Sequence, residues 1–322
     1  IMRLATLRSG TPDGQLVVVS RDNMRFLPGP TANLQALLER WDEESAVVAE
    51  RARRLDAGEG EPLDPAFCLA PLPRAWQWLD ASAFSTHGRL ITEAFKLEPV
   101  ATDPPLMYQG LSHRFLAPRE DVVLRTQDFG LDFEGEFGVI TDAVPMGVSA
   151  RDALGHIKLV VVINDWSQRA FTMSEMKRGF GWLHAKPASS IAPVCVSPDE
   201  LGGAWEEGRV CLPLHVSWNG ELFGRPNGSE MDVGFHDLIA YAAQTRDLPA
   251  GTIIGSGTVS NVDYAECGSA CIAERRAIEA IATGSAVTPF LAFGDVVRLE
   301  ARSDSGDPLF GVIEQRIVPF SG

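Results

Sequence analysis

The chain has 322 residues, of which 45% are hydrophobic and 22% charged, so it is long enough for roughly two domains with a large core. Its 28 Lys and Arg residues against 43 Asp and Glu residues give a formal charge of −15, a field that repels nucleic-acid phosphates and anionic membrane surfaces. We therefore expect neither nucleic acid nor a membrane as a partner.

The N-terminal segment carries the signals of a hairpin followed by a helix. Two short stretches, Leu4–Leu7 and Gln15–Ser20, flank a turn rich in Gly, Pro and Asp, which predicts paired strands. A helical pattern follows Thr31. The Pro, Gly and charged residues of Asp56–Pro73 are typical of a boundary. We predict a small N-terminal domain and a larger second domain, over residues 1–72 and 73–322.

The larger domain reads as a mixture of strands and helices in which strands dominate. From Asp121 onward, strand-like segments are separated by Gly, Pro and Asp turns. Helical candidates lie near Ser149–Lys158, Ser174–Arg178 and Gly234–Ala243. This mixture predicts the α+β class.

One predicted strand, Leu131–Ile140, places three acidic residues on a single face. Because side chains alternate along a strand, Asp132, Glu134 and Glu136 lie on the same side. Neighbouring charges about 7 Å apart repel by about 2 kcal/mol at an effective dielectric constant of ~20. Either a positive group lies close to this face, or the face is solvated and water screens the repulsion.

Four further segments carry residues suited to chemistry, each with a structural alternative. Asp165 ends a buried strand, as a metal ligand or a turn-capping residue does. Asp80 and His87, seven residues apart, lie on one side of a helix or meet through a loop, although a satisfied surface or core histidine fits as well. Lys186, among aromatic and small residues, needs a carboxylate or an anionic ligand unless it is a surface lysine. Gly251–Ser260 lacks the third glycine of a dinucleotide fingerprint, and we predict a backbone pocket for a carboxylate there.

The metal preference and the cellular location follow from residue types. Carboxylate oxygens at Glu134, Glu136 and Asp165 favour Mg²⁺, Mn²⁺ or Ca²⁺ over Zn²⁺.

The longest apolar run, Leu159–Ile163, is far shorter than the ~20 residues of a membrane-spanning helix. The five cysteines contain no C-x-x-C pair, so we expect reduced thiols in a cytoplasmic protein.

Taken in order, these motifs resemble a known family. The Glu-x-Glu strand, Asn164-Asp165-x-Ser-x-Arg, Lys186 and Gly257-Thr258-Val-Ser together resemble the fumarylacetoacetate hydrolase superfamily, with bacterial fumarylacetoacetase-like proteins as the nearest match. The resemblance implies a β-dominated, mixed β-sandwich or roll with a small β-rich N-terminal domain, and a homodimer.

The resemblance also implies a role for individual residues. The metal, Mg²⁺ or Ca²⁺ with Mn²⁺ as a further option, would be held by Asp80, Glu134, Glu136 and Asp165. His87 would be the general base, oriented by Glu274, and Lys186 would stabilise the departing carbanion or enolate. Substrate binding would involve Thr258, together with Ser82 and Lys96 near the positions where the family has a tyrosine and an arginine.

The implied activity is metal-dependent hydrolysis of a C–C bond in a β-diketo acid. The first expectation is cleavage of fumarylacetoacetate to fumarate and acetoacetate, a step of tyrosine breakdown, and a related acylpyruvate such as fumarylpyruvate fits as well. Many superfamily isomerases, hydratases and decarboxylases lack the arrangement of Asp80 and His87, which favours hydrolysis. Two alternatives stay open: one of those activities on a 2-oxo acid, or a non-catalytic binding protein.

Overall fold

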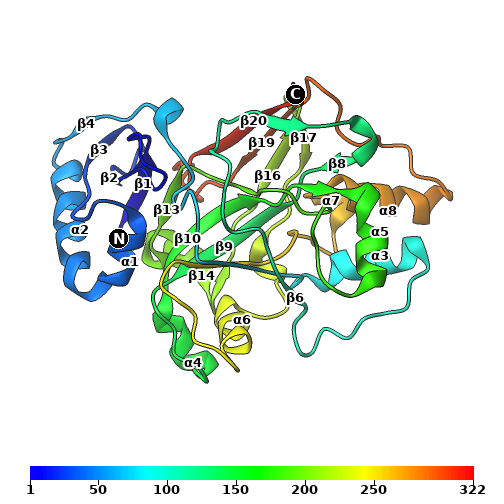
Figure 1. Cartoon of the computed structure of the whole chain (residues 1–322), viewed down its shortest axis with the longest axis horizontal. Coiled ribbons are helices and arrows are strands. Elements are labelled where there is room, and N and C mark those ends of the chain that lie inside the picture. Colours follow the sequence, from blue (N-terminus) through cyan, green and yellow to red (C-terminus); the bar gives the residue numbers. More distant parts are fainter.

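A large mixed sheet runs through the computed structural model, which describes residues 1–322 (Figure 1). The fold is α+β with strands dominating, as predicted. The sheet has eleven strands, and β12 (Ser190–Ile191) pairs with β10 beside the main path. The order along the main path is β4 (Glu61–Pro62), β3 (Arg25–Pro28), β2 (Gln15–Val19), β1 (Arg3–Leu7), β13 (Val194–Val196), β10 (Ile157–Asn164), β9 (Gly135–Thr141), β18 (Thr252–Gly255), β5 (Gln77–Ala81) and β6 (Met107–Gln109).

The centre of this sheet is formed by its most apolar strand. Strand β10 is rich in β-branched residues and almost entirely buried, as expected for a strand that is covered on both faces. It pairs antiparallel with β9 over nearly its whole length, so that Ile163 lies opposite Glu136. The carboxylate-bearing strand is therefore held in the interior of the protein.

Smaller sheets pack around the large one. A five-stranded sheet has the order β17 (Glu221–Gly224), β16 (His215–Trp218), β19 (Val296–Glu300), β20 (Val312–Pro319) and β7 (Val122–Leu124). Two further pairs are β8 (Leu131–Asp132) with β11 (Ser167–Gln168), and β14 (Trp205–Glu206) with β15 (Arg209–Val210). Phe137 of β9 contacts Phe310, which links the core under the large sheet to the C-terminal segment.

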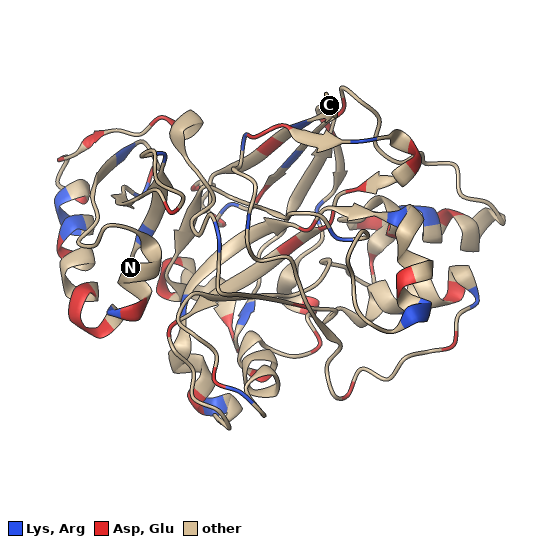
Figure 2. Cartoon of the chain, viewed as in Figure 1, with Lys and Arg blue, Asp and Glu red and all other residues tan.

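The helices lie at the periphery, and Figure 2 shows many charged residues along them. Three of them gather at one end of the molecule in Figure 1: α3 (Ser85–Phe95), α5 (Arg169–Arg178) and α8 (Ile272–Thr283). The others are α1 (Leu34–Glu39), α2 (Trp41–Asp56), α4 (Ala150–Ala153), α6 (Phe235–Ala242) and α7 (Tyr264–Cys267). None of the helices combines the length and the apolar character needed to cross a bilayer.

The N-terminal elements agree with the sequence in part. The predicted hairpin is confirmed as β1 and β2. The single helix expected after Thr31 is two helices, because the backbone leaves the helical region at Arg40. Strand β1 also pairs with β13, so the N-terminal strands extend the large sheet. The domain boundary between residues 72 and 73 stays a prediction.

One predicted helix is shorter than expected. The helical candidate at Ser149–Lys158 forms only α4 and a following 3-10 turn that ends at His156. The chain becomes a strand at Ile157 because this residue and its β-branched successors pair with β9. Tertiary pairing therefore overrides the local helical pattern.

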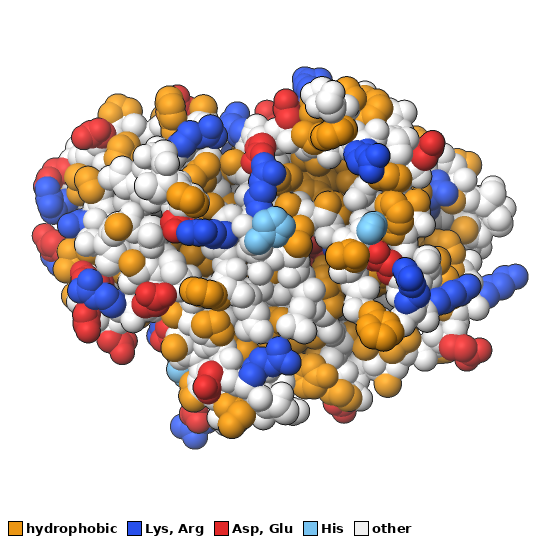
Figure 3. Space-filling model, viewed as in Figure 1, with side chains coloured by type: hydrophobic (Ala, Val, Ile, Leu, Met, Phe, Trp, Pro, Cys, Tyr) orange, Lys and Arg blue, Asp and Glu red, His pale blue; other side chains and the backbone are white.

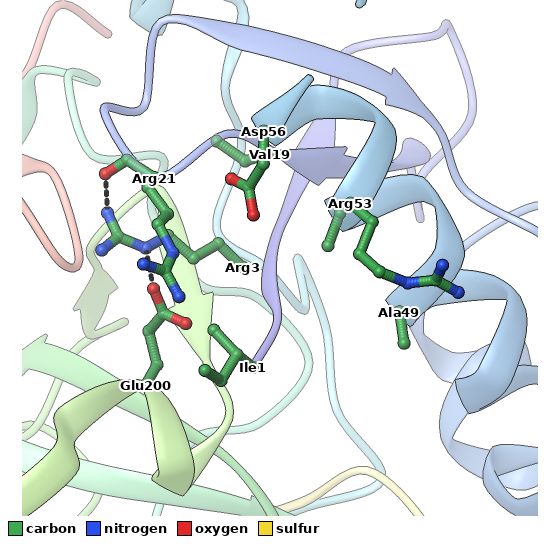
Figure 4. A pocket seen from close by; sticks show the side chains of 9 residues that line it. Ile1, Arg3, Val19, Arg21, Ala49, Arg53, Asp56 and Glu200 are labelled. Carbon is green, nitrogen blue, oxygen red and sulfur yellow. Dashed lines mark hydrogen bonds and ion pairs between the residues drawn. The ribbon is translucent and has the colours of Figure 1, made fainter. Parts of the chain in front are cut away.

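A buried ion pair joins β1 to the 3-10 helix η4 (Pro198–Ala204). Arg3 Nε donates to Glu200 Oε1 at 2.7 Å, and the two side chains are 4% and 3% exposed. Figure 4 shows this pair at the edge of a cavity of about 310 Å³ that Arg21 and Asp56 also line. The cavity lies apart from the acidic strand, so we assign the pair a structural role.

Replacing Glu200 with Ala is expected to destabilise the protein by about 3 kcal/mol, because it leaves the buried Arg3 charge without its carboxylate partner. Urea unfolding followed by circular dichroism measures this change. Asp13→Ala is the control, since its pair with Arg74 is largely exposed and is worth at most about 1 kcal/mol. Equal effects of the two variants would contradict the structural role.

Candidate active site

The acidic face of the predicted strand lies in the protein interior. Asp132 and Glu136 are completely buried and Glu134 is 5% exposed. The strand is interrupted at Phe133 and Glu134, which separate β8 from β9, but all three carboxylates stay on the inner side. The solvated alternative for this face is therefore wrong.

The positive groups required by these buried charges come from two segments distant in sequence. Arg169, the first residue of α5, donates to Asp132 Oδ2 at 2.9 Å and to Glu134 Oε1 at 2.6 Å. Lys186 Nζ lies 2.7 Å from Glu134 Oε2 and 2.7 Å from Asp165 Oδ2. Burial raises the pKa of Glu134, but Lys186 and Arg169 outweigh it and lower that pKa to about 2.

Three carboxylates converge beside these ion pairs, and Asp165, which also contacts Lys186, is one of them. Asp80 at the end of β5, Glu136 on β9 and Asp165 after β10 each offer an oxygen, and these oxygens lie within 4.8 Å of one another. Strand β18 aligns two of the elements, since Gly255 is the register partner of Asp80 on one side and of Gly138 on the other. We call Asp80, Glu136 and Asp165 the acidic triad.

The electrostatics of the acidic triad favour the binding of a positive charge. Neither oxygen of Glu136 has a hydrogen-bond partner. Burial, followed by the charges of Asp80 and Asp165, raises the pKa of Glu136 well above its ordinary value. Burial and the charge of Asp165 do the same for the pKa of Asp80. Clustered carboxylate oxygens of this kind suit a hard divalent cation such as Mg²⁺, Mn²⁺ or Ca²⁺.

Glu134, the fourth predicted metal ligand, lies next to the acidic triad but outside it. Both of its oxygens are engaged, one by Arg169 and the other by Lys186. The residues that fit a metal in this arrangement are Asp80, Glu136 and Asp165, and a role for Glu134 as a direct ligand stays a prediction.

The sequence reasoning missed Tyr108, which donates its hydroxyl to Asp165 Oδ2 at 2.6 Å. Strand β6 places Tyr108 opposite Asp80 in the antiparallel register. Its ring also lies beside Lys186 Nζ, 5.7 Å from the centroid, and edge-on to Trp182. The three-residue strand β6 has no recognisable pattern, so only its pairing with β5 could have revealed this residue.

We expect Tyr108→Phe to weaken Mn²⁺ binding by about 10-fold to 100-fold, because groups that orient a metal ligand typically contribute that much. Isothermal titration of the metal-free protein measures the affinity without any substrate. Tyr241→Phe on α6 is the control, and it should leave the affinity unchanged. Wild-type affinity in Tyr108→Phe would show that Lys186 and Ser189 suffice to hold Asp165.

A histidine and a buried glutamate form a pair next to these carboxylates. His87 Nδ1 lies 2.8 Å from Glu274 Oε2, and Glu274 is completely buried. His87 belongs to the first turn of α3 and Glu274 to the first turn of α8, two helices packed against each other. His87 is among the groups that contribute to the low pKa of Glu134, so the pair lies within electrostatic reach of the site.

Two of the three predicted substrate-binding residues lie at a turn beside Asp80, and the third lies away from it. Thr258 is buried just after β18, beside Gly257, whose N–H donates to Asp80 Oδ1 at 3.3 Å. Gly257 has a positive φ, and a Cβ there would collide with the carbonyl of Ala81, so only glycine fits. Ser82, which follows Ala81 in the chain, is exposed at this turn. The structure does not bring Lys96 to the triad: it is exposed at the far end of α3, about 13 Å along the helix from His87.

Together these groups offer three chemical capacities in one place. The acidic triad can hold a hard cation, His87 can move a proton, and Lys186 is a buried ammonium whose pKa the surrounding carboxylates raise despite its burial. This set suits reactions that pass through an enolate or a carbanion next to a carbonyl group.

On the face drawn in Figure 3, charged side chains of both signs are interspersed with hydrophobic ones.

The chain matches known families over nearly its whole length. Residues 78–318 match "Fumarylacetoacetate (FAA) hydrolase C-terminal" and residues 2–74 match "Fumarylacetoacetase N-terminal domain 2". A 2,4-didehydro-3-deoxy-L-rhamnonate hydrolase from Sphingomonas sp. (strain SKA58) is 29% identical over 51% of this chain and 55% of its own length. The human mitochondrial oxaloacetate tautomerase FAHD2A is 26% identical over 49% of each chain. The chain thus spans about half the length of these curated relatives.

Solved structures share the same fold. A putative HpcE protein from Mycobacterium smegmatis superposes with a TM-score of 0.69 at 21% identity, covering 99% of this chain and 100% of its own. The maleylpyruvate hydrolase of Sphingobium sp. SYK-6, solved with manganese(II) and pyruvate, gives a TM-score of 0.66 at 15% identity, with 99% and 100% covered. At these identities the likeness extends to the fold alone.

Proposed function

We infer from the membership of this chain in the fumarylacetoacetate hydrolase family that it is an enzyme, and we propose that it hydrolyses a C–C bond of a β-diketo acid with a divalent cation. Relatives and structural neighbours in this superfamily include hydrolases, isomerases and tautomerases. The observation that carries the choice of hydrolysis is the contact of His87 with Glu274 next to the buried carboxylates.

In this proposal His87 supplies the base that hydrolysis needs. Its Nδ1 faces Glu274, which leaves Nε2 to take a proton from water. The resulting hydroxide adds to a carbonyl carbon, the adjacent C–C bond breaks, and the leaving carbon receives the proton from Nε2. Glu274 stabilises the imidazolium during this cycle.

Lys186 stabilises the charge of the leaving group in this proposal, and a bound divalent cation would assist it. A carbon leaves only when its negative charge is delocalised onto an oxygen. The Lys186 ammonium lies among the carboxylates and is positioned to stabilise that oxygen. A divalent ion held by Asp80, Glu136 and Asp165 would supply Lewis-acid polarisation of the dicarbonyl oxygens. Thr258 is proposed to bind a substrate carboxylate.

The proposed substrate is fumarylacetoacetate, with an acylpyruvate such as fumarylpyruvate as the nearest variant. A second candidate is isomerisation or tautomerisation of a 2-oxo acid, favoured by the 26% identity to the human oxaloacetate tautomerase. The two candidates differ in whether a C–C bond breaks, because a tautomerase leaves the carbon chain intact.

A substrate panel tests the proposal. Purified protein is incubated with fumarylacetoacetate, fumarylpyruvate or oxaloacetate, with Mn²⁺ or with chelator, and the products are separated by chromatography. We expect cleavage products from a β-diketo acid only when metal is present. Conversion of oxaloacetate tautomers without any cleavage product would favour the second candidate, and inactivity on all three would contradict both.

We further propose a cytoplasmic homodimer. The exposed apolar side chains of α5 and the loop after it, among them Met176, Phe180 and Leu183, offer a surface that a second copy would cover. Light scattering coupled to size-exclusion chromatography gives the mass in solution, and a monomer at micromolar concentration would contradict the dimer.

A further inference from the structure

Asp132 is the buried carboxylate of the acidic strand that the proposed chemistry does not use. It lies at the end of β8, is completely buried and accepts three hydrogen bonds. Its Oδ1 accepts from the N–H of Ile272 at 2.7 Å, and its Oδ2 accepts from the N–H of Ala273 at 2.8 Å and from Arg169 Nε at 2.9 Å. Every donor belongs to another element.

Two of these contacts fix the start of α8. Ile272 and Ala273 are its first two residues, and Glu274 is the third. A carboxylate at this position satisfies N–H groups that have no partner within the helix, and it interacts favourably with the positive end of the helix dipole. Asp132 therefore sets where Glu274 enters the site.

The third contact ties the same carboxylate to the charged groups of the site. Arg169 bridges Asp132 and Glu134, and Glu134 also contacts Lys186. The backbone reinforces this link, because Glu134 and Cys271 form a bridge and the N–H of Gly135 donates to the carbonyl of Ala270. The strand that leads into the metal cluster and the helix that carries Glu274 are thus held to one another around Asp132.

We propose that Asp132 is a positioning residue for His87: it clamps the first turn of α8 so that Glu274 meets the imidazole at a fixed distance from the carboxylate cluster. This inference rests on the proposed function, since it assigns His87 the role of base. Asp132 touches neither the acidic triad nor His87 itself. It acts on the reaction only through Glu274 and Arg169.

Removing Asp132 is expected to displace α8 rather than unfold it. The sulfur of Cys271 also accepts the N–H of Glu274, at 3.3 Å, so the helix keeps a cap. In Asp132→Asn the amide nitrogen cannot accept a hydrogen bond and faces donors from the helix and Arg169. The first turn of α8 must then shift to separate these donors.

A measurement on His87 tests the proposal without any substrate. The proton on Nδ1 that bonds to Glu274 is observed by NMR of protein with ¹⁵N-labelled histidine. We expect Asp132→Asn to remove or shift this signal as Glu274→Gln does, while Mn²⁺ affinity stays within about threefold of wild type because the acidic triad is intact. An unchanged signal overturns the proposal.

A double-mutant cycle then separates positioning from a general structural effect. We expect Asp132→Asn to lower kcat about 10-fold to 100-fold with little change in KM, and to cause no further loss in a Glu274→Gln background. Multiplicative losses in the double mutant overturn the proposal. Absence of C–C cleavage by the wild type contradicts the proposed function instead, and the NMR result distinguishes the two failures.

The control removes a carboxylate that accepts a backbone N–H at the start of another helix. Asp237 Oδ2 accepts the N–H of Gly234 at the beginning of α6, and Asp237→Asn should leave the His87 signal and kcat unchanged. If Asp132→Asn does not fold, Asp132→Ser serves the same test, since its single short hydroxyl cannot satisfy both helix N–H groups and Arg169. Its expected and contradicting outcomes are the same.

Discussion

Replacing His87 with Asn is expected to lower kcat for C–C cleavage about 100-fold to 10,000-fold, which corresponds to about 3 to 5 kcal/mol in the activation barrier. The asparagine amide can still donate to Glu274 in place of Nδ1, but nothing replaces Nε2 as the proton acceptor. The loss therefore isolates proton transfer from the packing of α3 against α8. Steady-state kinetics with saturating Mn²⁺ measures it.

Two control measurements show whether this loss of activity is specific to proton transfer by His87. Mn²⁺ affinity of His87→Asn, measured by isothermal titration, should equal that of wild type because His87 does not belong to the acidic triad. His184→Asn should retain full activity, since His184 is 57% exposed and contacts Glu175 outside the site. Undiminished cleavage by His87→Asn would remove the base from the mechanism and favour a tautomerase, whose proton transfers need not pass through this residue.

The parts of the site that lie on regular strands were predictable from the sequence. Alternation along Leu131–Ile140 placed Glu134 and Glu136 on one face. The repulsion between them left two alternatives, a nearby cation or a solvated face, and the contacts of Glu134 with Arg169 and Lys186 confirm the first. The apolar run before Asp165 predicted a buried strand, which is β10. Strand period and burial are local properties, so a single sequence reveals them.

The contacts that depend on tertiary pairing could not be predicted in this way. Tyr108 reaches Asp165 because β6 adds to the edge of the sheet in a particular register with β5. Asp132 reaches α8 across 140 residues of sequence. The pairing of His87 with Glu274 was expected only from the family resemblance, since neither α3 nor α8 carries a local signal that the two first turns meet.

The charges of the site do not balance within the protein. Two cations, Arg169 and Lys186, contact this group of five buried carboxylates, so full ionisation of all five would leave three negative charges (5 − 2 = 3). The five are Asp80, Asp132, Glu134, Glu136 and Asp165. Uncompensated buried charge is costly, and proteins relieve it by pairing, by metal binding or by taking up protons. The orphaned oxygens of Glu136 are where the imbalance is concentrated.

Replacing Glu136 with Gln is therefore expected to have opposite effects on metal affinity and on the stability of the metal-free protein. Mn²⁺ affinity should fall at least about 100-fold, because one of three charged ligands is lost. The metal-free variant should unfold at a higher temperature than metal-free wild type, because a neutral amide removes the repulsion from Asp80 and Asp165. Calorimetry in the presence of chelator measures the second effect.

The pH dependence of that stability difference makes the test sharper. Because the pKa of Glu136 is raised in the folded protein, metal-free wild type loses stability as the pH rises from the ordinary glutamate value of 4.5 through the raised pKa. The advantage of Glu136→Gln should therefore be small near pH 4.5 and grow toward neutral pH. Asp142→Asn, which alters a carboxylate next to the opposite end of β9, should leave Mn²⁺ affinity unchanged. If Glu136→Gln bound Mn²⁺ as wild type does and showed no stability gain, the acidic triad would not be the metal site. The buried charge of Glu136 would then affect neither the affinity for the metal nor the stability of the metal-free protein.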